Sequence, residues 1–237
     1  MKRLLLFGAL LLCLSCDSKL YDSYMSIGYV ARYYDIKDIS LKQDAQLVYV
    51  KTNVLQKACA SDKDNSQYEQ LAKKYGDTSY NKEVFYELNY PTGRPVAYSK
   101  DMCAIHITSN VDFDSTHPAG SDLGNIVMFY GQSPYPYIQS NYTQAVDWQK
   151  IADTHPHLFD AQHDGFLYLG NYPGCHFVNK RVSELTTEDL KMLCGNRAYL
   201  WAILEFTVLP TDVSRYTITV ELQDEEGILY TSEVEMK

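Results

Sequence analysis

The chain has 237 residues, enough for one sizeable hydrophobic core or two small ones. Its 30 acidic residues outnumber its 21 Lys and Arg, and the net charge of −9 argues against nucleic acid as a partner. The 21 tyrosines, against 8 phenylalanines and 2 tryptophans, favour a β-rich fold, because Tyr suits half-buried strand positions.

The first fifteen residues have the pattern of a secretory signal peptide. Lys2 and Arg3 precede an uncharged, Leu-rich run over residues 4–14. As a helix this run would rise ~16 Å, about half of a ~30 Å hydrocarbon core, so it is too short to span a membrane. Ser15 then precedes Cys16, and this segment resembles the lipobox of bacterial lipoproteins, in which the Cys becomes the lipid-modified N-terminus.

This interpretation divides the chain into three segments. We expect a signal peptide over 1–15, a lipidated Cys16 and tether over 16–26, and a single β-rich domain over 27–237. Removal of the signal leaves 19 basic against 30 acidic residues, a net charge of −11. Cys13 stands where a lipobox usually has Leu, so a secreted protein cut near Ser15 and an uncleaved anchor are the alternatives.

Strand-like segments run through the rest of the chain. Short β-prone runs occupy 46–50, 83–88, 102–108, 126–130, 166–169 and 199–209. The last of these is almost wholly apolar, which predicts a place at the centre of the sheet. At the C-terminus, apolar residues alternate with polar ones over 216–222 and again over 228–236, on either side of a turn at 223–227. This pattern predicts a hairpin with one buried face.

Three short helices are predicted between the strands. They cover 66–75, about 144–152, and the stretch from Thr186 to Leu193 with Gly195 behind it. In the third, Thr186 and Asp189 have the spacing of a capping box. Because strands dominate, we expect a mainly β fold, an antiparallel immunoglobulin-like β-sandwich with short inserted helices.

Four cysteines remain beyond the signal and Cys16: Cys59, Cys103, Cys175 and Cys194. An exported chain meets an oxidising compartment, so these four cysteines could form two disulfides, in any of three alternative connectivities. Cys175 with Cys194 is the candidate pair, because that bridge closes a short loop. Cys103 alternates with Ile105 and Ile107 on one strand face, where a buried free thiol is the alternative.

A histidine-rich stretch is the weak candidate for a metal site. Its imidazoles are those of His155, His157 and His163. Pro156 prevents an i, i+4 pair of ligands on one helix, and such loop histidines are commonly solvated turn residues. We therefore expect neither a metal nor any other cofactor.

An aromatic segment is the candidate ligand-binding site. Its aromatic residues are Tyr135, Tyr137, Tyr142 and Trp148, and Pro134 and Pro136 stiffen it. Rigid exposed aromatic rings stack on sugars at low conformational cost. The alternative is local packing, in which an inserted loop buries its own aromatic residues.

The chain contains no nucleophile elbow, zinc-protease helix, Walker loop or dinucleotide fingerprint. We therefore expect a non-enzymatic binding module with a glycan or protein partner. An extracytoplasmic hydrolase and a purely structural envelope component are the alternatives.

The basic start, the Leu-rich core, Cys16 before Asp17-Ser18 and the Tyr-rich β region together resemble lipoproteins of Bacteroidetes. The segment 112–123 and the C-terminal hairpin are similar to a group of uncharacterised lipoproteins from that phylum. The resemblance implies a palmitate-bearing anchor in the outer membrane, facing the periplasm or the cell surface, and implies no activity.

Overall fold

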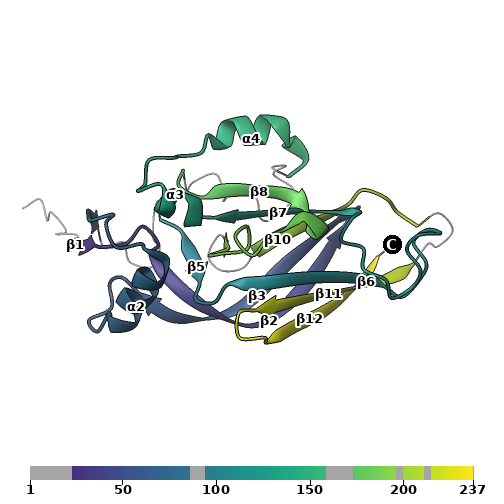
Figure 1. Ribbon diagram of the computed structural model, residues 1–237, viewed down its shortest axis with the longest axis horizontal. Coiled ribbons are helices and arrows are strands. Elements are labelled where there is room, and N and C mark those ends of the chain that lie inside the picture. Colours follow the sequence, from purple (N-terminus) through teal and green to yellow (C-terminus); the bar gives the residue numbers. More distant parts are fainter. Residues whose placement is uncertain (1–22, 86–93, 159–172, 196–199, 211–214, 237) are drawn as a thin grey trace, which may run out of the picture.

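The computed structural model describes residues 23–85, 94–158, 173–195, 200–210 and 215–236, which form a mainly β structure with short helices (Figure 1). The prediction of a mainly β fold with antiparallel sheets is confirmed. The signal peptide, Cys16, His163 and the predicted strand at 166–169 lie outside the described residues.

The described strands are β1 (Ser23–Ser26), β2 (Arg32–Asp44), β3 (Leu47–Cys59), β4 (Lys82–Phe85), β5 (Val96–Tyr98), β6 (Met102–Ser109), β7 (Val127–Ser133), β8 (His176–Arg181), β9 (Cys194–Gly195), β10 (Leu200–Phe206), β11 (Tyr216–Asp224) and β12 (Leu229–Met236). The described helices are α2 (Ser66–Tyr75), α3 (Tyr135–Gln139) and α4 (Trp148–Thr154), with 3-10 turns η1 (Pro156–Leu158) and η3 (Val182–Glu184).

The described strands form three sheets. Seven strands pair in the order β8-β7-β10-β3-β2-β5-β9, and only the contact between β2 and β5 is parallel among the described pairs. Three strands pair in the order β12-β11-β6, and β1 pairs with β4. The apolar strand predicted for the centre of the sheet is β10, which lies between β7 and β3, one place from the central strand β3.

Both faces of the seven-stranded sheet are covered. One face packs on the three-stranded sheet, where Val50 and Leu204 share a core with Ile218. The other face holds a second core that includes Tyr33 and Ile203 and is covered by helical segments. Figure 1 shows β6, β11 and β12 on the opposite side of the molecule from α3 and α4. The seven-stranded sheet is therefore the middle layer of the molecule.

The C-terminal hairpin is formed as predicted. β11 and β12 pair from Tyr216 opposite Met236 to Gln223 opposite Leu229. Alternate residues of β11 are buried, which is the pattern of a strand with one wet face. Asp224 fixes the turn, because its carboxylate accepts the backbone N–H groups of Glu226 at 3.0 Å and Ile228 at 2.9 Å.

Helix α2 also agrees with its prediction. Tyr68, Ala72 and Tyr75 form its buried face, and Gly76 ends it with a φ of 73°, a left-handed conformation that glycine adopts at no steric cost. α4 begins at Trp148, slightly later than predicted, because the Asp147 side chain accepts the N–H groups of Gln149 and Lys150.

The helix predicted from Thr186 is wrong, because this stretch is a run of turns. The capping hydrogen bonds exist, with the Asp189 carboxylate 2.8 Å from the Thr186 N–H. Met192 then takes a left-handed φ of 49° and donates its N–H to Asp101, so the helix does not propagate. Leu190 and Leu193 are nevertheless buried, as the pattern indicated.

Two further expectations need correction. Cys103 is exposed, because a register shift between β11 and β6 at Gln223 and Asp224 turns Met102 inward in its place. The last four residues of the predicted tether form β1, which pairs with β4. Among the described residues, no helix has the length and apolarity needed to cross a membrane.

Candidate functional site

The aromatic segment predicted as a binding site begins with α3. Pro134 precedes this helix and Pro136 lies in its first turn, where the fixed φ of proline suits a helix start. After α3, Asn141 and Tyr142 have φ angles of 53° and 60°. The Tyr142 N–H donates to the Tyr137 carbonyl at 2.9 Å, which brings the two tyrosines together.

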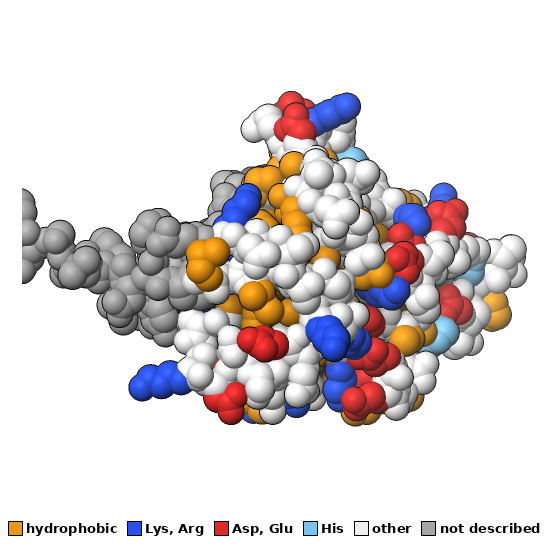
Figure 2. Space-filling model, turned by 60° about the vertical axis from the view of Figure 1, so that its left-hand side comes forward, with side chains coloured by type: hydrophobic (Ala, Val, Ile, Leu, Met, Phe, Trp, Pro, Cys, Tyr) orange, Lys and Arg blue, Asp and Glu red, His pale blue; other side chains and the backbone are white. Residues whose placement is uncertain are grey.

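Four tyrosines close into a ring of edge-on and tilted contacts, which we call the tyrosine cluster. Its members are Tyr29, Tyr80, Tyr137 and Tyr142. Ring centroids lie 4.9 Å apart for Tyr29–Tyr137, 5.3 Å for Tyr29–Tyr80, 5.3 Å for Tyr80–Tyr142 and 5.6 Å for Tyr137–Tyr142. Tyr29 is buried, whereas the other three rings are only partly buried and keep a surface toward solvent. Figure 2 brings this end of the molecule forward and shows hydrophobic side chains gathered below α4.

The buried carboxylate of Asp77 holds two members of the tyrosine cluster in place. Asp77 has no solvent exposure and accepts hydrogen bonds from the N–H groups of Tyr29 at 2.6 Å and Val30 at 2.9 Å, and from the Tyr142 hydroxyl at 2.9 Å. Burial is the main cause that raises the pKa of Asp77. Burial, and then the charge of Asp77, raise the pKa of Tyr142 to about 12, so this hydroxyl stays a donor.

A buried cation completes this support. The Arg94 guanidinium donates to the carbonyls of Gly28 at 2.6 Å, Tyr29 at 3.0 Å and Val30 at 3.0 Å, and it lies 6.0 Å from the centroid of the Tyr80 ring. A Cβ atom on Gly174 would lie 2.7 Å from the Tyr29 ring and closer still to the Tyr137 ring. The Tyr29 and Tyr137 rings therefore pack too closely against Gly174 for a side chain at that position.

The four aromatic residues predicted to form a ligand-binding site do not all lie together in the structure. Tyr137 and Tyr142 join the cluster, whereas the Tyr135 ring lies under the Lys191 ammonium at 4.7 Å. Trp148 is 6 % exposed and packs edge-on against Phe177 beneath α4. The local-packing alternative therefore describes Trp148. Sequence reasoning missed Tyr29 and Tyr80, because both lie far from the aromatic segment in the chain and carry no local motif.

The described histidines among the weak candidates for metal ligands lie outside the tyrosine cluster. His155 is 2.9 Å from the Asn179 amide, and His157 is 3.4 Å from the Glu205 carboxylate. Both rings pack edge-on against Tyr130. Within the part of the chain that the structure describes, no group of three or more His, Cys, Asp or Glu side chains is arranged to hold a metal.

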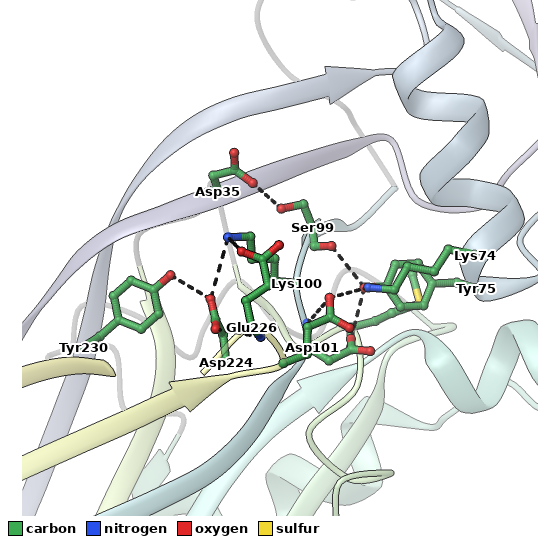
Figure 3. A network of polar contacts seen from close by, with 11 residues as sticks. Asp35, Lys74, Tyr75, Ser99, Lys100, Asp101, Asp224, Glu226 and Tyr230 are labelled. Carbon is green, nitrogen blue, oxygen red and sulfur yellow. Dashed lines mark hydrogen bonds and ion pairs between the residues drawn. The ribbon is translucent and has the colours of Figure 1, made fainter. Parts of the chain in front are cut away.

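A network of charged side chains joins the two larger sheets (Figure 3). Lys100 binds Glu226 at 2.6 Å and Asp224 at 3.8 Å, and the Tyr230 hydroxyl donates to Asp224 at 3.1 Å. In the same way, Tyr75 donates to Asp101 at 3.1 Å. Because these carboxylates already have cations or hydroxyls as partners, the network is best explained as a clamp that holds the hairpin turn near α2.

A shallow groove of about 340 Å³ offers the nearest approach to a hydrolytic site, with Cys103, His106 and Asp122 among its lining residues. His106 lies 3.1 Å from Asp122. Burial and then nearby acids raise the pKa of the Cys103 thiol, so the reactive thiolate is disfavoured. Cys103 and His106 are three positions apart on β6, which corresponds to ~10 Å between their Cα atoms in a regular strand. Nothing in this geometry or in its pKa marks Cys103 as an activated nucleophile.

The predicted cysteine pair is brought together. The sulfur atoms of Cys175 and Cys194 lie 3.5 Å apart, and both side chains are buried. Burial raises the pKa of the Cys175 thiol well above its ordinary value. The geometry is thus compatible with a disulfide, and the bond itself stays a prediction.

Comparison of the chain with known protein families, with curated proteins and with solved structures gave no match.

Proposed function

We propose that this chain is an exported, lipid-anchored protein of the cell envelope whose β domain binds a glycan through the tyrosine cluster and the adjacent Tyr135. The observation that carries the proposal is the support of three partly exposed rings by buried Asp77 and Arg94. Rings already fixed in place lose little entropy when a sugar stacks on them, so preorganisation favours binding.

The anchor is proposed from the sequence alone. The basic start, the short apolar run and Ser15 before Cys16 support lipidation at Cys16, with palmitate among the attached acyl chains. The resemblance to Bacteroidetes lipoproteins supports an outer-membrane location. With its acidic charge, the mature chain is not expected to bind nucleic acid.

For the fold we propose a distant relation to the immunoglobulin-like sandwich. Its support is a three-stranded antiparallel sheet packed on a larger sheet around one core. An experimental structure whose strand connections could be superposed on that fold would support the relation, and a different connectivity would end it.

A glycan array probed with the mature protein tests the function. Tyr135→Ala and Tyr137→Ala are the informative variants, and Tyr34→Ala is the matched control, because Tyr34 is a partly buried tyrosine that packs against the other core. We expect loss of one stacked ring to weaken binding about tenfold, equivalent to ~1.4 kcal/mol.

Thermal unfolding of each variant separates binding from packing. Binding predicts a clear loss of affinity with only a small loss of stability for Tyr135→Ala, because this ring is partly buried against the second core and lies 4.7 Å from the Lys191 ammonium. A folded wild-type protein that leaves every glycan unbound would contradict the proposal and favour a structural envelope component.

A further inference from the structure

The tyrosine cluster lies beside the strand on which the described chain begins. The Tyr80 N–H donates to the Ile27 carbonyl at 2.9 Å, directly after β1. β4, which follows Tyr80, pairs with β1 from Ser23 opposite Phe85 to Ser26 opposite Lys82. Figure 1 shows β1 and α3 at the same end of the long axis of the molecule. The candidate site is therefore at the end where the proposed lipid anchor joins the domain.

The length of the intervening chain limits how far this end can move from the membrane. Six residues, 17–22, separate Cys16 from Ser23. Even fully extended, the seven steps from Cys16 to Ser23 reach ~25 Å. A domain of this length has a radius of gyration of ~17 Å and is therefore ~44 Å across. A lipid on Cys16 would thus keep β1 and the tyrosine cluster nearer to the bilayer surface than the domain is wide.

The side chains at this end suit the interface between lipid and water. Met25 of β1 is 62 % exposed. The ammonium of Lys82 lies 4.8 Å from the centroid of the Tyr80 ring, and that of Lys191 lies 4.7 Å from the Tyr135 ring. Tyrosine rings favour the headgroup region, and lysines beside them attract headgroup phosphates.

We infer that the ligand of the tyrosine cluster is a saccharide carried by the anchoring membrane, namely the sugar headgroup of a glycolipid. The inference rests on the proposed function, because it requires both the anchor on Cys16 and sugar binding by the cluster. Because the lipid anchor would hold the tyrosine cluster beside the headgroups, the effective concentration of the sugar at the cluster would be high. A few stacked rings would then suffice for binding, even if their affinity for a free sugar is weak.

Tyrosine nitration on vesicles tests the inference. The full-length lipidated protein is reconstituted into phosphatidylethanolamine and phosphatidylglycerol vesicles, with or without galactosyl diacylglycerol or lipopolysaccharide. Mass spectrometry follows nitration of Tyr80, Tyr137 and Tyr142, with Tyr34 as internal control. We expect one glycolipid to slow nitration of the cluster several-fold while that of Tyr34 is unchanged.

A lengthened tether is the matched control variant. Insertion of about 30 Gly and Ser residues between Asp17 and Asp22 gives a flexible spacer of ~30 Å, which frees the domain to turn away. We expect this variant to lose most of the glycolipid-dependent protection and to keep its affinity for soluble oligosaccharides.

The outcomes separate the inference from the proposed function. Glycan binding on an array without protection by any glycolipid would overturn the inference and leave the proposed function standing. Equal protection in plain phospholipid vesicles would also overturn it, because the surface would then pack on lipid without reading a sugar. Failure to bind any sugar, free or on vesicles, would overturn both.

Discussion

Asp77 is a carboxylate without solvent exposure, and two backbone N–H groups and one hydroxyl depend on it. Asp77→Ala would leave these donors unpaired and would remove the buried carboxylate charge that Arg94 attracts. We expect the free energy of unfolding to fall by ~3–5 kcal/mol. Asp77→Asn keeps one acceptor oxygen, so its loss should be ~1–3 kcal/mol.

Urea denaturation measures both changes. Asp153→Ala is the control, because Asp153 is exposed on α4 and should change stability by less than ~0.5 kcal/mol. Equal effects of Asp77→Ala and Asp153→Ala would mean that Asp77 does not support the tyrosine cluster.

His117 gives the structure a predictable response to pH. Its ring lies 2.9 Å from both carboxylate oxygens of Asp114 and 2.8 Å from the Asn125 amide oxygen. The hydrogen bond to Asp114 raises the pKa of His117. Because a raised histidine pKa means that the folded state holds the proton more tightly, the stabilisation is full below the ordinary pKa of ~6.5. It is lost as the pH rises through the raised pKa.

The melting temperature of His117→Gln should therefore lie well below that of the wild type at about pH 5, and the gap should narrow toward about pH 9. His106→Gln is the control, because the contact of His106 with Asp122 is exposed and contributes little to stability. A gap for His117→Gln that stays constant over this range would contradict a charged His117.

At the scale of elements, Cys175 immediately before β8 and Cys194 in β9 meet across the second core. We expect protein isolated from an oxidising compartment to carry this disulfide, which would close a loop of about 20 residues and contribute ~3 kcal/mol. Replacing both residues by Ser should lower the melting temperature accordingly.

Peptide mapping under non-reducing conditions checks the connectivity. Exposed Cys103 should react with iodoacetamide in the folded protein, whereas Cys175 and Cys194 should react only after reduction and unfolding. A disulfide that joins Cys175 or Cys194 to Cys59 or Cys103 would contradict this pairing.

For the whole molecule, the proposed location depends on the proposed anchor. Labelling with a palmitate analogue should mark the wild-type chain and leave Cys16→Ala unlabelled, because we propose that residue as the attachment point of the acyl chains. Cys13→Ala is the control and should still be labelled. Labelling of Cys16→Ala as well as Cys13→Ala, or no labelling of the wild type, would contradict lipidation at Cys16.

The sequence predicted those parts of the fold whose signal is local. The alternation in β11, the apolar run of β10 and the face and Gly76 terminus of α2 each lie within one short window. The prediction failed at Met192, where a long-range hydrogen bond to Asp101 stops a helix that its own capping residues favour. Tertiary contacts override local propensity in such places.

The candidate site was predictable only in part, for the same reason. Tyr137 and Tyr142 belong to one stiffened segment, and the sequence singled them out. Tyr29 and Tyr80 join them through packing, and Asp77 supports them through hydrogen bonds to distant residues. No local pattern in a single sequence contains those contacts.

The interior position of β10 also determines when the chain can fold. Val50 of β3 pairs with Leu41 of β2 on one side and with Ala202 of β10 on the other, so the middle of the large sheet is completed by residues close to the C-terminus. A contact between such distant parts of the chain slows folding, because a long loop must close first. During synthesis, one side of β3 stays an unpaired apolar edge until residue 206 has emerged, and that edge is prone to aggregate. Delivery of the chain to its final compartment in an unfolded state would bring β3 and β10 there together, so that β3 could pair with β10 as soon as folding begins.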